Sequence, residues 1–448
     1  MTTAAPGSLR KRVLRGSAFE LGGYGAQQVM RLGSNLILTR LLFPEAFGLS
    51  TLVSILIMGL VLLSDVGVQQ FLIQSPRGEE PTFVNTAFTF QAVRGCVLAF
   101  IMVVLAYPAA WFYKEPQLAP LICFGSLQLV FGGLHSTSVY TLRRRLALGW
   151  ITALELGQSV LSLVIMIPWA WARPGVWPLV GGGVAASLAY AIATHFLPVP
   201  YRNRFAWDKA AYQEISHFGR WIFGSTAVGF LGGQSDRILL GRFLGAGWLG
   251  IYSVALNLSE AVSAVIGRLI GGIVYPVLSQ AAREPGSDMS AMYYRVRLRL
   301  DALSMTGTGL LVGMGGWVIT TLWDDRYTDA AWILRILCVR VAVSCIVGPG
   351  ETCLFSLGHT RYGFWRSVSR LVSTLVGIPL GWHFGGVVGV IWASVLAEVP
   401  AFFIVWPKLR SLKILRLRRE LLSVGIFLAA MGVGLAILPW LPRIHVRH

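Results

Sequence analysis

Charged residues are scarce in this chain. Only 13% of its 448 residues are Asp, Glu, Lys or Arg, and 55% are hydrophobic, whereas about a quarter of the residues in a soluble domain are charged. Apolar stretches long enough to cross a bilayer follow one another almost from end to end. The composition excludes an ordinary soluble protein and predicts an all-α, polytopic integral membrane protein.

The motifs of common enzyme and metal sites are also missing. The sequence contains no GxxxxGK[ST], no HExxH and no GxSxG, and its five cysteines show no CxxC spacing. These absences exclude a chain that hydrolyses ATP by itself, a zinc protease of the HExxH type and a serine hydrolase of the GxSxG type. We expect a protein that is not an enzyme and that needs neither a metal nor another cofactor, apart from a coupling ion, H⁺ or Na⁺.

Hydrophobic periodicity and turn residues divide the chain into thirteen expected spans. Basic residues then fall unevenly, with 23 on the side of the N-terminus and 5 on the other side. By the positive-inside rule this places the N-terminus in the cytoplasm, and the net charge of +18 reflects orientation in a membrane, not binding to nucleic acid. The expected spans are 17–41, 48–73, 84–110, 118–141, 150–170, 176–197, 216–242, 249–278, 300–322, 331–357, 364–384, 387–406 and 421–441.

Two weak internal repeats indicate a duplication. Arg40-Leu41-Leu42 returns as Arg242-Phe243-Leu244, and Ile167-Pro168 returns as Ile378-Pro379. The first pair is separated by six crossings, an even number, so that both copies run in the same direction. The sequence therefore predicts two six-helix lobes related by a pseudo-twofold axis along the membrane normal. The expected parts are an N-terminal lobe at 1–200, a C-terminal lobe at 201–410 and an additional helix at 411–448.

Arginines inside the expected spans are the strongest functional signal. An arginine at mid-bilayer costs roughly 2.5–3.5 kcal/mol on insertion scales, so it normally faces water or a partner. Arg31, Arg94 and Arg268 lie too deep to reach the interface easily. They line a polar lumen or form structural ion pairs, and we favour the lumen. We expect Arg237 or Arg340 to pair with a carboxylate on another helix and group both with this cationic set. Arginines nearer the helix ends suit interface anchoring: Arg40, Arg220, Arg242, Arg335 and Arg370.

Carboxylates also occur inside the spans, and two interpretations of them remain open. They bind H⁺ or Na⁺ and couple transport to an ion gradient, or they are counter-ions of neighbouring arginines. The candidates for ion coupling are Asp65, Asp236, Glu260, Glu351 and Glu398.

Several motifs resemble those of one transporter family. They are the stretches Arg40–Leu49 (RLLFPEAFGL), Ser64–Gly67 (SDVG), Phe71–Gln74 (FLIQ), Ser235–Gly245 (SDRILLGRFLG) and Leu249–Ser253 (LGIYS). They resemble the polysaccharide transporter family, the Wzx-type lipid-linked oligosaccharide flippases of the multidrug/oligosaccharidyl-lipid/polysaccharide exporter superfamily.

The resemblance implies twelve to fourteen helices, so either one or two C-terminal helices would follow the two six-helix lobes. It also implies movement of undecaprenyl-diphosphate-linked oligosaccharides from the cytoplasmic to the periplasmic leaflet of a bacterial inner membrane by alternating access. The partners it implies are the lipid-linked sugar, membrane lipid, and the glycan polymerase and export machinery. Two alternatives stay open: a cation-coupled multidrug extruder of the same superfamily, and a membrane-embedded glycan polymerase or transferase.

Overall fold

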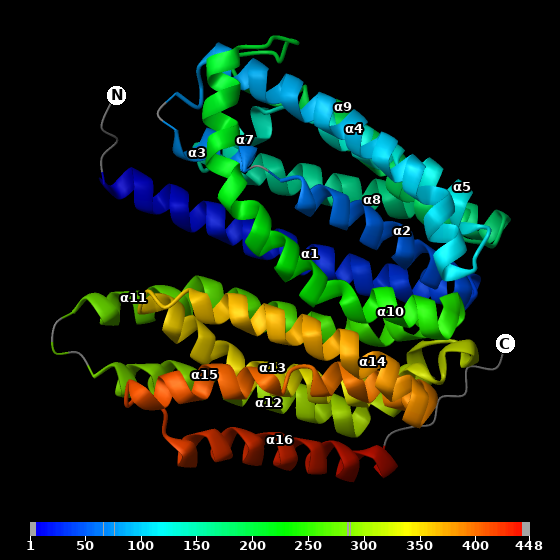
Figure 1. Cartoon of the computed structure of the whole chain (residues 1–448), viewed down its shortest axis with the longest axis vertical. Coiled ribbons are helices and arrows are strands. Elements are labelled where there is room, and N and C mark those ends of the chain that lie inside the picture. The colour runs from blue at the N-terminus through cyan, green and yellow to red at the C-terminus, as the bar shows by residue number, and fades with distance from the viewer. Residues whose placement is uncertain (1–5, 66, 76, 285, 287, 441–448) are drawn as a thin grey trace. The chain divides into compact units, whose positions relative to one another are not determined.

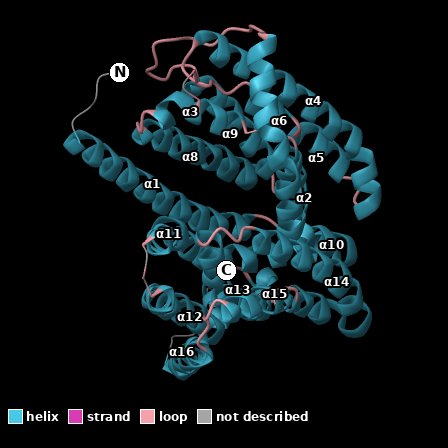
Figure 2. Cartoon of the chain, turned by 60° about the vertical axis from the view of Figure 1, so that its left-hand side comes forward, coloured by secondary structure: helices cyan, strands magenta, loops and turns pink. Residues whose placement is uncertain are grey.

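The computed structural model defines the bounds of the helices in the described part of the chain. The structure describes residues 6–65, 67–75, 77–284, 286 and 288–440, without the side chains of residues 6–18, 21 and 215–225. These residues form helices and connecting loops and no strand (Figures 1 and 2). The helices are α1 (Pro6–Leu41), α2 (Pro44–Leu63), α3 (Val68–Gln74), α4 (Pro81–Tyr113), α5 (Leu118–Gly125), α6 (Leu127–Gly133), α7 (Ser138–Arg144), α8 (Leu148–Ala172), α9 (Trp177–Thr194), α10 (Lys209–Leu269), α11 (Tyr275–Arg283), α12 (Met289–Leu322), α13 (Ala330–Ser356), α14 (Arg361–Leu396), α15 (Pro400–Ser411) and α16 (Leu417–Ile437).

Proline and glycine set several of these boundaries. Pro44 and Pro81 open α2 and α4, where the missing N–H of proline would have no partner within the helix anyway. Gly67 lies between α2 and α3 with a φ of 69°, a left-handed conformation that glycine adopts without a steric penalty. The predicted span 48–73 is therefore broken into a long and a short helix.

Nine helical segments in the described part of the chain are long and apolar enough to cross a membrane. Two of them, Thr226–Arg283 with 58 residues and Arg361–Ser411 with 51 residues, exceed what one crossing needs, since about 20 residues span the hydrocarbon core. Gly245 (φ 82°) and Gly386 (φ 54°) break the helical backbone inside these two segments. Each segment thus corresponds to two of the predicted spans.

The helices α5 and α6 together bend by 55° against α7 and form a tenth segment that passes the same test. It matches the predicted span 118–141. The predicted span 17–41 falls on α1, which is outside these segments. The predicted all-helical membrane fold is confirmed, and the total of thirteen crossings stays a prediction.

The chain divides into two compact units, Met1–Ala227 and Val228–His448, called here the N-terminal unit and the C-terminal unit. In the first, α8 packs between α1 and α9, and α4 packs on α5 and α6. In the second, α12 packs between α13 and α16, and Figures 1 and 2 show α12 and α16 side by side. The predicted lobe boundaries at 200 and 410 stay predictions, and α16 is packed within the second unit.

Glycines bring helices into close contact in both units. A Cβ on Gly95 of α4 would lie 2.6 Å from the carbonyl oxygen of Leu129 and 2.9 Å from the Cα of Gly133 in α6. A Cβ on Gly313 of α12 would lie 2.8 Å from the Cα of Gly434 in α16. Small residues at such contacts let backbones approach where lipid provides no hydrophobic driving force.

Candidate functional site

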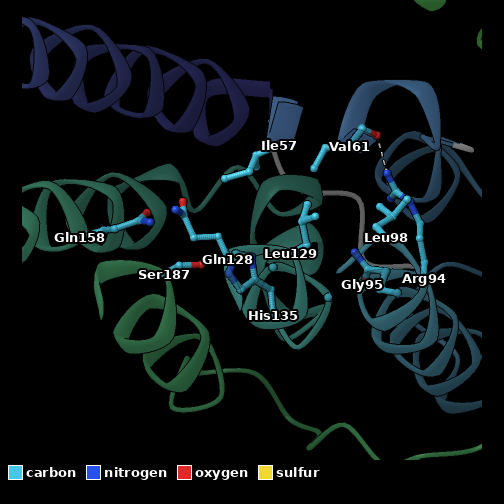
Figure 3. Close-up of a pocket in the computed structure, with 13 residues that line it drawn as sticks. Ile57, Val61, Arg94, Gly95, Leu98, Gln128, Leu129, His135, Gln158 and Ser187 are labelled. Atoms are coloured by element: carbon cyan, nitrogen blue, oxygen red, sulfur yellow. Dashed lines mark hydrogen bonds between the residues drawn. The ribbon is translucent and has the colours of Figure 1, made fainter. Parts of the chain in front are cut away.

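A cavity with several polar side chains in its wall lies inside the N-terminal unit. Its volume is about 330 Å³, and α2, α4, α6, α8 and α9 all contribute to its wall. Figure 3 shows the labelled polar side chains around it. We call it the amide cavity, because three of its polar side chains are carboxamides. The residues that line it are Ile57, Val61, Gln91, Arg94, Gly95, Leu98, Gln128, Leu129, Gly132, Gly133, His135, Gln158 and Ser187. None of them is a carboxylate.

Arg94 is the cation of this cavity, and its hydrogen-bond partners are neutral. Its Nε and Nη2 donate to the Oγ of Ser64 at 3.0 and 2.8 Å, and Nη2 also donates to the carbonyl of Val61 at 2.6 Å. Asp65, next to Ser64, accepts a hydrogen bond from the backbone N–H of Gly67 at 2.9 Å instead. The positive charge of Arg94 is held in place without a direct ion pair among the described residues.

Two buried polar atoms at the cavity have no hydrogen-bond partner in the described part of the chain. Gln91 donates through Nε2 to the hydroxyl of Tyr140 at 2.7 Å, but its Oε1 is buried and unpartnered. The Nε2 of His135 is likewise buried and unpartnered, while its ring packs edge-on against Tyr190 with centroids 4.7 Å apart. A buried polar atom without a partner costs about 1–3 kcal/mol. A ligand that forms hydrogen bonds with these two atoms would recover part of this cost.

The sequence of α4 explains how its side chains reach one cavity. Gln91, Arg94, Gly95 and Leu98 follow the spacing i, i+3, i+4, i+7, which places them on one face of a helix. Gly95 allows α6 to come close enough for Gln128 to complete the wall.

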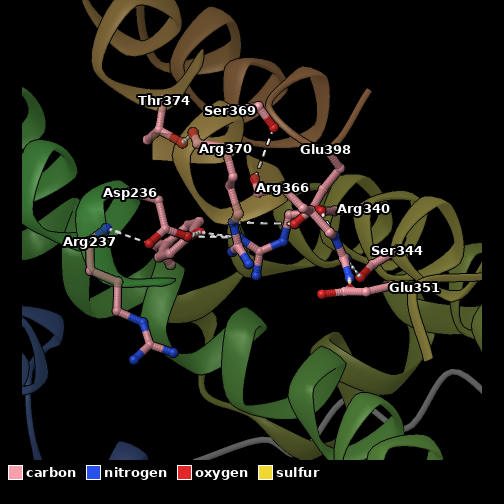
Figure 4. A network of polar contacts seen from close by, with 11 residues as sticks. Asp236, Arg237, Arg340, Ser344, Glu351, Arg366, Ser369, Arg370, Thr374 and Glu398 are labelled. Carbon is pink, nitrogen blue, oxygen red and sulfur yellow. Dashed lines mark hydrogen bonds and ion pairs between the residues drawn. The ribbon is translucent and has the colours of Figure 1, made fainter. Parts of the chain in front are cut away.

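The C-terminal unit contains a different polar arrangement (Figure 4). The Oδ2 of Asp236 on α10 accepts from the hydroxyl of Tyr252 at 2.8 Å and lies 2.7 Å from the Nη1 of Arg340 on α13. Asp236 is 5% and Arg340 7% exposed. Because both side chains are buried, removing one of them would leave the charge of the other buried without a partner.

Two more arginines continue the chain of ion pairs on α14. Arg366 pairs with Glu351 and lies 3.5 Å from the Oε2 of Glu398, and the Nε of Arg370 lies 3.3 Å from Oε1 of the same glutamate. Figure 4 shows the guanidinium groups of Arg340, Arg366 and Arg370 close together between the carboxylates. Three arginines and three carboxylates balance in this arrangement, which we call the arginine–carboxylate network: Asp236, Arg340, Glu351, Arg366, Arg370 and Glu398.

A separate pair lies beside the network. Arg237 forms an ion pair with Glu260 and donates to the Oε1 of Gln234 at 2.8 Å. Arg237 and Glu260 lie on opposite sides of the break at Gly245. The expectation that Arg237 or Arg340 pairs with a carboxylate from another helix is met, since Arg340 joins α13 to α10.

The structure places the predicted site residues in different environments. Arg94 lines the amide cavity, whereas Arg31 is exposed on α1 and Arg268 is partly buried near the end of α10. Arg31 and Arg94 belong to the N-terminal unit and Arg268 to the C-terminal unit, and their joint role in one polar lumen stays a prediction. The side chain of Arg220 lies outside the described residues. Four of the five carboxylates predicted for ion coupling, all except Asp65, pair with an arginine, as the counter-ion interpretation expects: Asp236, Glu260, Glu351 and Glu398.

Sequence reasoning missed the neutral residues of the amide cavity and one buried cation. Gln128 and Gln158 are amides within apolar helices, and this polarity was a usable signal. Arg297 precedes the expected span 300–322, but α12 begins at Met289, and Arg297 is 2% exposed. The prediction was wrong there because helical periodicity alone did not place the start of the helix.

Comparisons with known proteins agree on a family. The family model described as "Polysaccharide biosynthesis protein" matches residues 37–332. The chain is 22% identical to the teichuronic acid biosynthesis protein TuaB of Bacillus subtilis (strain 168) over 76% of this chain and 70% of that protein. It is 24% identical to the succinoglycan biosynthesis transport protein ExoT of Rhizobium meliloti (strain 1021) over 84% of this chain and 76% of that protein.

A solved structure shares the fold. The lipid II flippase MurJ in an inward closed conformation superposes with a TM-score of 0.74 at 13% sequence identity, covering 94% of this chain and 92% of that one. At this identity the likeness concerns the fold.

Proposed function

The chain belongs to the polysaccharide biosynthesis protein family, and from this premise we propose that it is a flippase for lipid-linked sugar units. In this proposal it moves undecaprenyl-diphosphate-linked oligosaccharides from the cytoplasmic to the periplasmic leaflet of a bacterial inner membrane. The movement proceeds by alternating access and draws on an ion gradient, because the sequence contains no ATP-binding P-loop.

The amide cavity is the observation that carries the proposal. A lipid-linked sugar brings phosphate groups and many hydroxyls into a membrane, where each needs a partner. Arg94 offers a guanidinium with neutral partners, which suits phosphate because its charge is permanent and its donors form a planar fork. The carboxamides of Gln91, Gln128 and Gln158 provide both donors and acceptors for sugar hydroxyls.

The multidrug extruder is less well supported. An organic cation requires an acidic binding site, but the residues that line the amide cavity include no carboxylate. The carboxylates of the arginine–carboxylate network are already paired with guanidinium groups. Both observations favour an anionic, hydroxyl-rich substrate.

Deletion of the gene in its native host tests the proposal. We expect undecaprenyl-diphosphate-linked glycan to accumulate, measured by mass spectrometry of lipid extracts, and to stay inaccessible to a glycosidase added to spheroplasts. The wild-type gene should reverse both effects. No accumulation, together with a new sensitivity to cationic dyes, would favour the drug extruder.

Arg94→Ala tests the site within the same assay. Losing a charge-assisted hydrogen bond of about 1.5–3 kcal/mol predicts about a 10-fold to 100-fold lower flipping rate at normal protein abundance. Arg94→Lys should recover part of the rate, since it restores the charge without the fork. The matched control is Arg326→Ala, because Arg326 pairs with Asp324 outside the helical spans. Full activity of Arg94→Ala would exclude the amide cavity as the substrate site.

A further inference from the structure

The C-terminal end of α2 lies at the wall of the amide cavity, and Arg94 reaches it from α4. The last four carbonyl groups of a helix have no partner within the helix, and they form the negative end of its dipole. The Nη2 of Arg94 donates to one of them, the carbonyl of Val61, at 2.6 Å (Figure 3). Ser64, the residue directly after α2, donates its hydroxyl to another, the carbonyl of Leu60, at 2.5 Å. The backbone at this end of α2 therefore attracts the guanidinium.

The hydroxyl of Ser64 adds a second contact to the same guanidinium. A serine hydroxyl has one proton and two lone pairs. Its proton is used toward Leu60, so the oxygen accepts from the Nε and the Nη2 of Arg94, at 3.0 and 2.8 Å. These two nitrogens form one edge of the planar guanidinium. A contact with both of them fixes the orientation of the plane, which a contact with one nitrogen would not do.

The remaining nitrogen of the guanidinium is left for a ligand. The Nη1 of Arg94 has no hydrogen-bond partner in the described part of the chain, and it is not among the buried unpartnered atoms there. Arg94 lines the amide cavity. Nη1 is therefore the nitrogen that an anionic group in this cavity can reach without displacing a contact within the protein.

The carboxylate next to Ser64 is engaged elsewhere. The Oδ1 of Asp65 accepts from the backbone N–H of Gly67 at 2.9 Å, in the turn where Gly67 adopts a φ of 69°. A direct ion pair with a carboxylate would offset the charge of Arg94. A hydroxyl orients the same guanidinium and leaves its charge available.

We infer that Ser64 is a positioning residue for Arg94. Its hydroxyl holds the Nε–Nη2 edge of the guanidinium at the end of α2 and leaves Nη1 to bind the anionic group of a ligand in the amide cavity. The inference rests on the proposed function for the ligand, a lipid diphosphate. The contact between Ser64 and Arg94 does not depend on that proposal.

A serine that only closes the end of its helix is the alternative, and α2 offers a matched control for it. The hydroxyl of Ser54 donates to the carbonyl of Ser50 at 2.9 Å, four residues back, as Ser64 does to Leu60. No hydrogen bond joins Ser54 to an arginine among the described residues. Ser54→Ala therefore removes the same kind of local hydrogen bond without affecting Arg94.

The orientation of Arg94 is measurable without any ligand. In full-length protein labelled with ¹⁵N-arginine in detergent, the Nε–H signal of Arg94 is the one that Arg94→Lys removes. Ser64→Ala should speed the exchange of this proton with water about fivefold, because about one hydrogen bond is lost. Ser64→Thr, which restores a hydroxyl, and Ser54→Ala should exchange as the wild type does. An unchanged exchange rate in Ser64→Ala would overturn the inference.

Binding of undecaprenyl diphosphate tests the consequence for the ligand. Isothermal titration calorimetry of the same proteins measures its affinity, with undecaprenol as the uncharged control lipid. Ser64→Ala should bind the diphosphate about tenfold more weakly, since the charge-assisted contacts that orient Arg94 are lost. Ser64→Thr should recover most of the affinity, and the melting temperature of Ser64→Ala should match that of Ser54→Ala.

A double variant separates positioning from a purely structural role. Lysine has no Nε–Nη2 edge for Ser64 to hold, so Ser64→Ala should add little to the loss of affinity in Arg94→Lys. An additional loss as large as that in the wild-type background would mean that Ser64 acts apart from Arg94, and it would overturn the inference.

The two proposals fail separately. If Arg94→Ala weakens binding of the diphosphate but Ser64→Ala does not, the site stands and the positioning role is wrong. If the wild-type protein binds undecaprenol as well as undecaprenyl diphosphate, the proposed substrate is wrong. The exchange rate of the Nε proton then still decides whether Ser64 orients Arg94.

Discussion

Arg94 of the N-terminal unit and the arginines of the arginine–carboxylate network in the C-terminal unit have opposite kinds of partners. In the N-terminal unit, Arg94 donates to a serine hydroxyl and a backbone carbonyl and lines the amide cavity. In the C-terminal unit, Arg340, Arg366 and Arg370 are each paired with a carboxylate. An arginine with neutral partners keeps its charge available to a ligand, whereas an ion-paired arginine joins helices. Partners, more than depth in the membrane, separate a binding role from a structural one.

The largest effect is expected where an ion pair of the network is broken. Asp236→Asn removes the partner of buried Arg340, and breaking a buried pair from one side costs about 3–5 kcal/mol. Chemical unfolding in detergent measures this loss. Asp236→Asn with Arg340→Met should recover most of it, because no buried charge is left alone. Equal stability of Asp236→Asn and wild type would contradict the structural role of the ion-paired arginines.

A smaller effect is expected at the glycine contact between α12 and α16. Gly313→Ala places a Cβ 2.8 Å from the Cα of Gly434, and because that atom belongs to the backbone the helices must separate, at about 1–3 kcal/mol. Gly432→Ala is the control on α16, where a Cβ would meet no atom within 4 Å. Unfolding of both variants in detergent decides the matter, and a loss of stability in Gly432→Ala alone would contradict the prediction.

The amides of the cavity should matter for transport more than for folding. Gln158→Leu removes hydrogen-bonding groups from the amide cavity, and one neutral hydrogen bond of about 1 kcal/mol predicts a roughly fivefold lower flipping rate. Protein abundance in the membrane should be unchanged. The deletion strain that carries each variant gives the rate, with Gln213→Leu, outside the residues that line the cavity, as the control. Equal loss in both variants would make the effect nonspecific.

The smallest effect is expected at an exposed ion pair outside the spans. Arg145 donates to both carboxylate oxygens of Glu79, at 3.1 and 2.7 Å, and these hydrogen bonds lower the pKa of Glu79 below its ordinary value of 4.5. Both side chains are more than a third exposed, so the pair contributes at most about 1 kcal/mol.

The pH dependence of this pair has a definite sign. Because the folded pKa of Glu79 is lowered, its contribution is present above the ordinary pKa and disappears as the pH falls through the folded pKa. Glu79→Gln should therefore be slightly less stable than wild type at neutral pH and equally stable in acid. Unfolding at successive pH values measures the difference, and a gap that widens in acid would contradict this sign.

Much of the fold was predictable because membranes impose simple rules. Long apolar stretches, with Gly245 and Gly386 between them, marked the crossings that the structure breaks at the same glycines. The resemblance of Arg40–Leu49 and Ser235–Gly245 to the polysaccharide transporter family is confirmed by the family match over residues 37–332. The buried ion pair of Arg297 with Glu420 was not predicted, because the two residues are 123 positions apart.

The sequence by itself determined that the chain lies in a membrane, that it is helical and which family it belongs to. Hydrophobic length and local motifs are properties of residues that are neighbours in the sequence. The sequence also listed nearly all of the charges that matter. Only the tertiary structure decided which of these charges cancel. Asp236 meets Arg340 from 104 positions away, Arg94 meets no carboxylate among the residues lining its cavity, and Arg297 meets both Asp301 and Glu420. Charge balance inside a membrane is a sum over spatial neighbours, and these neighbours are chosen by the packing of helices.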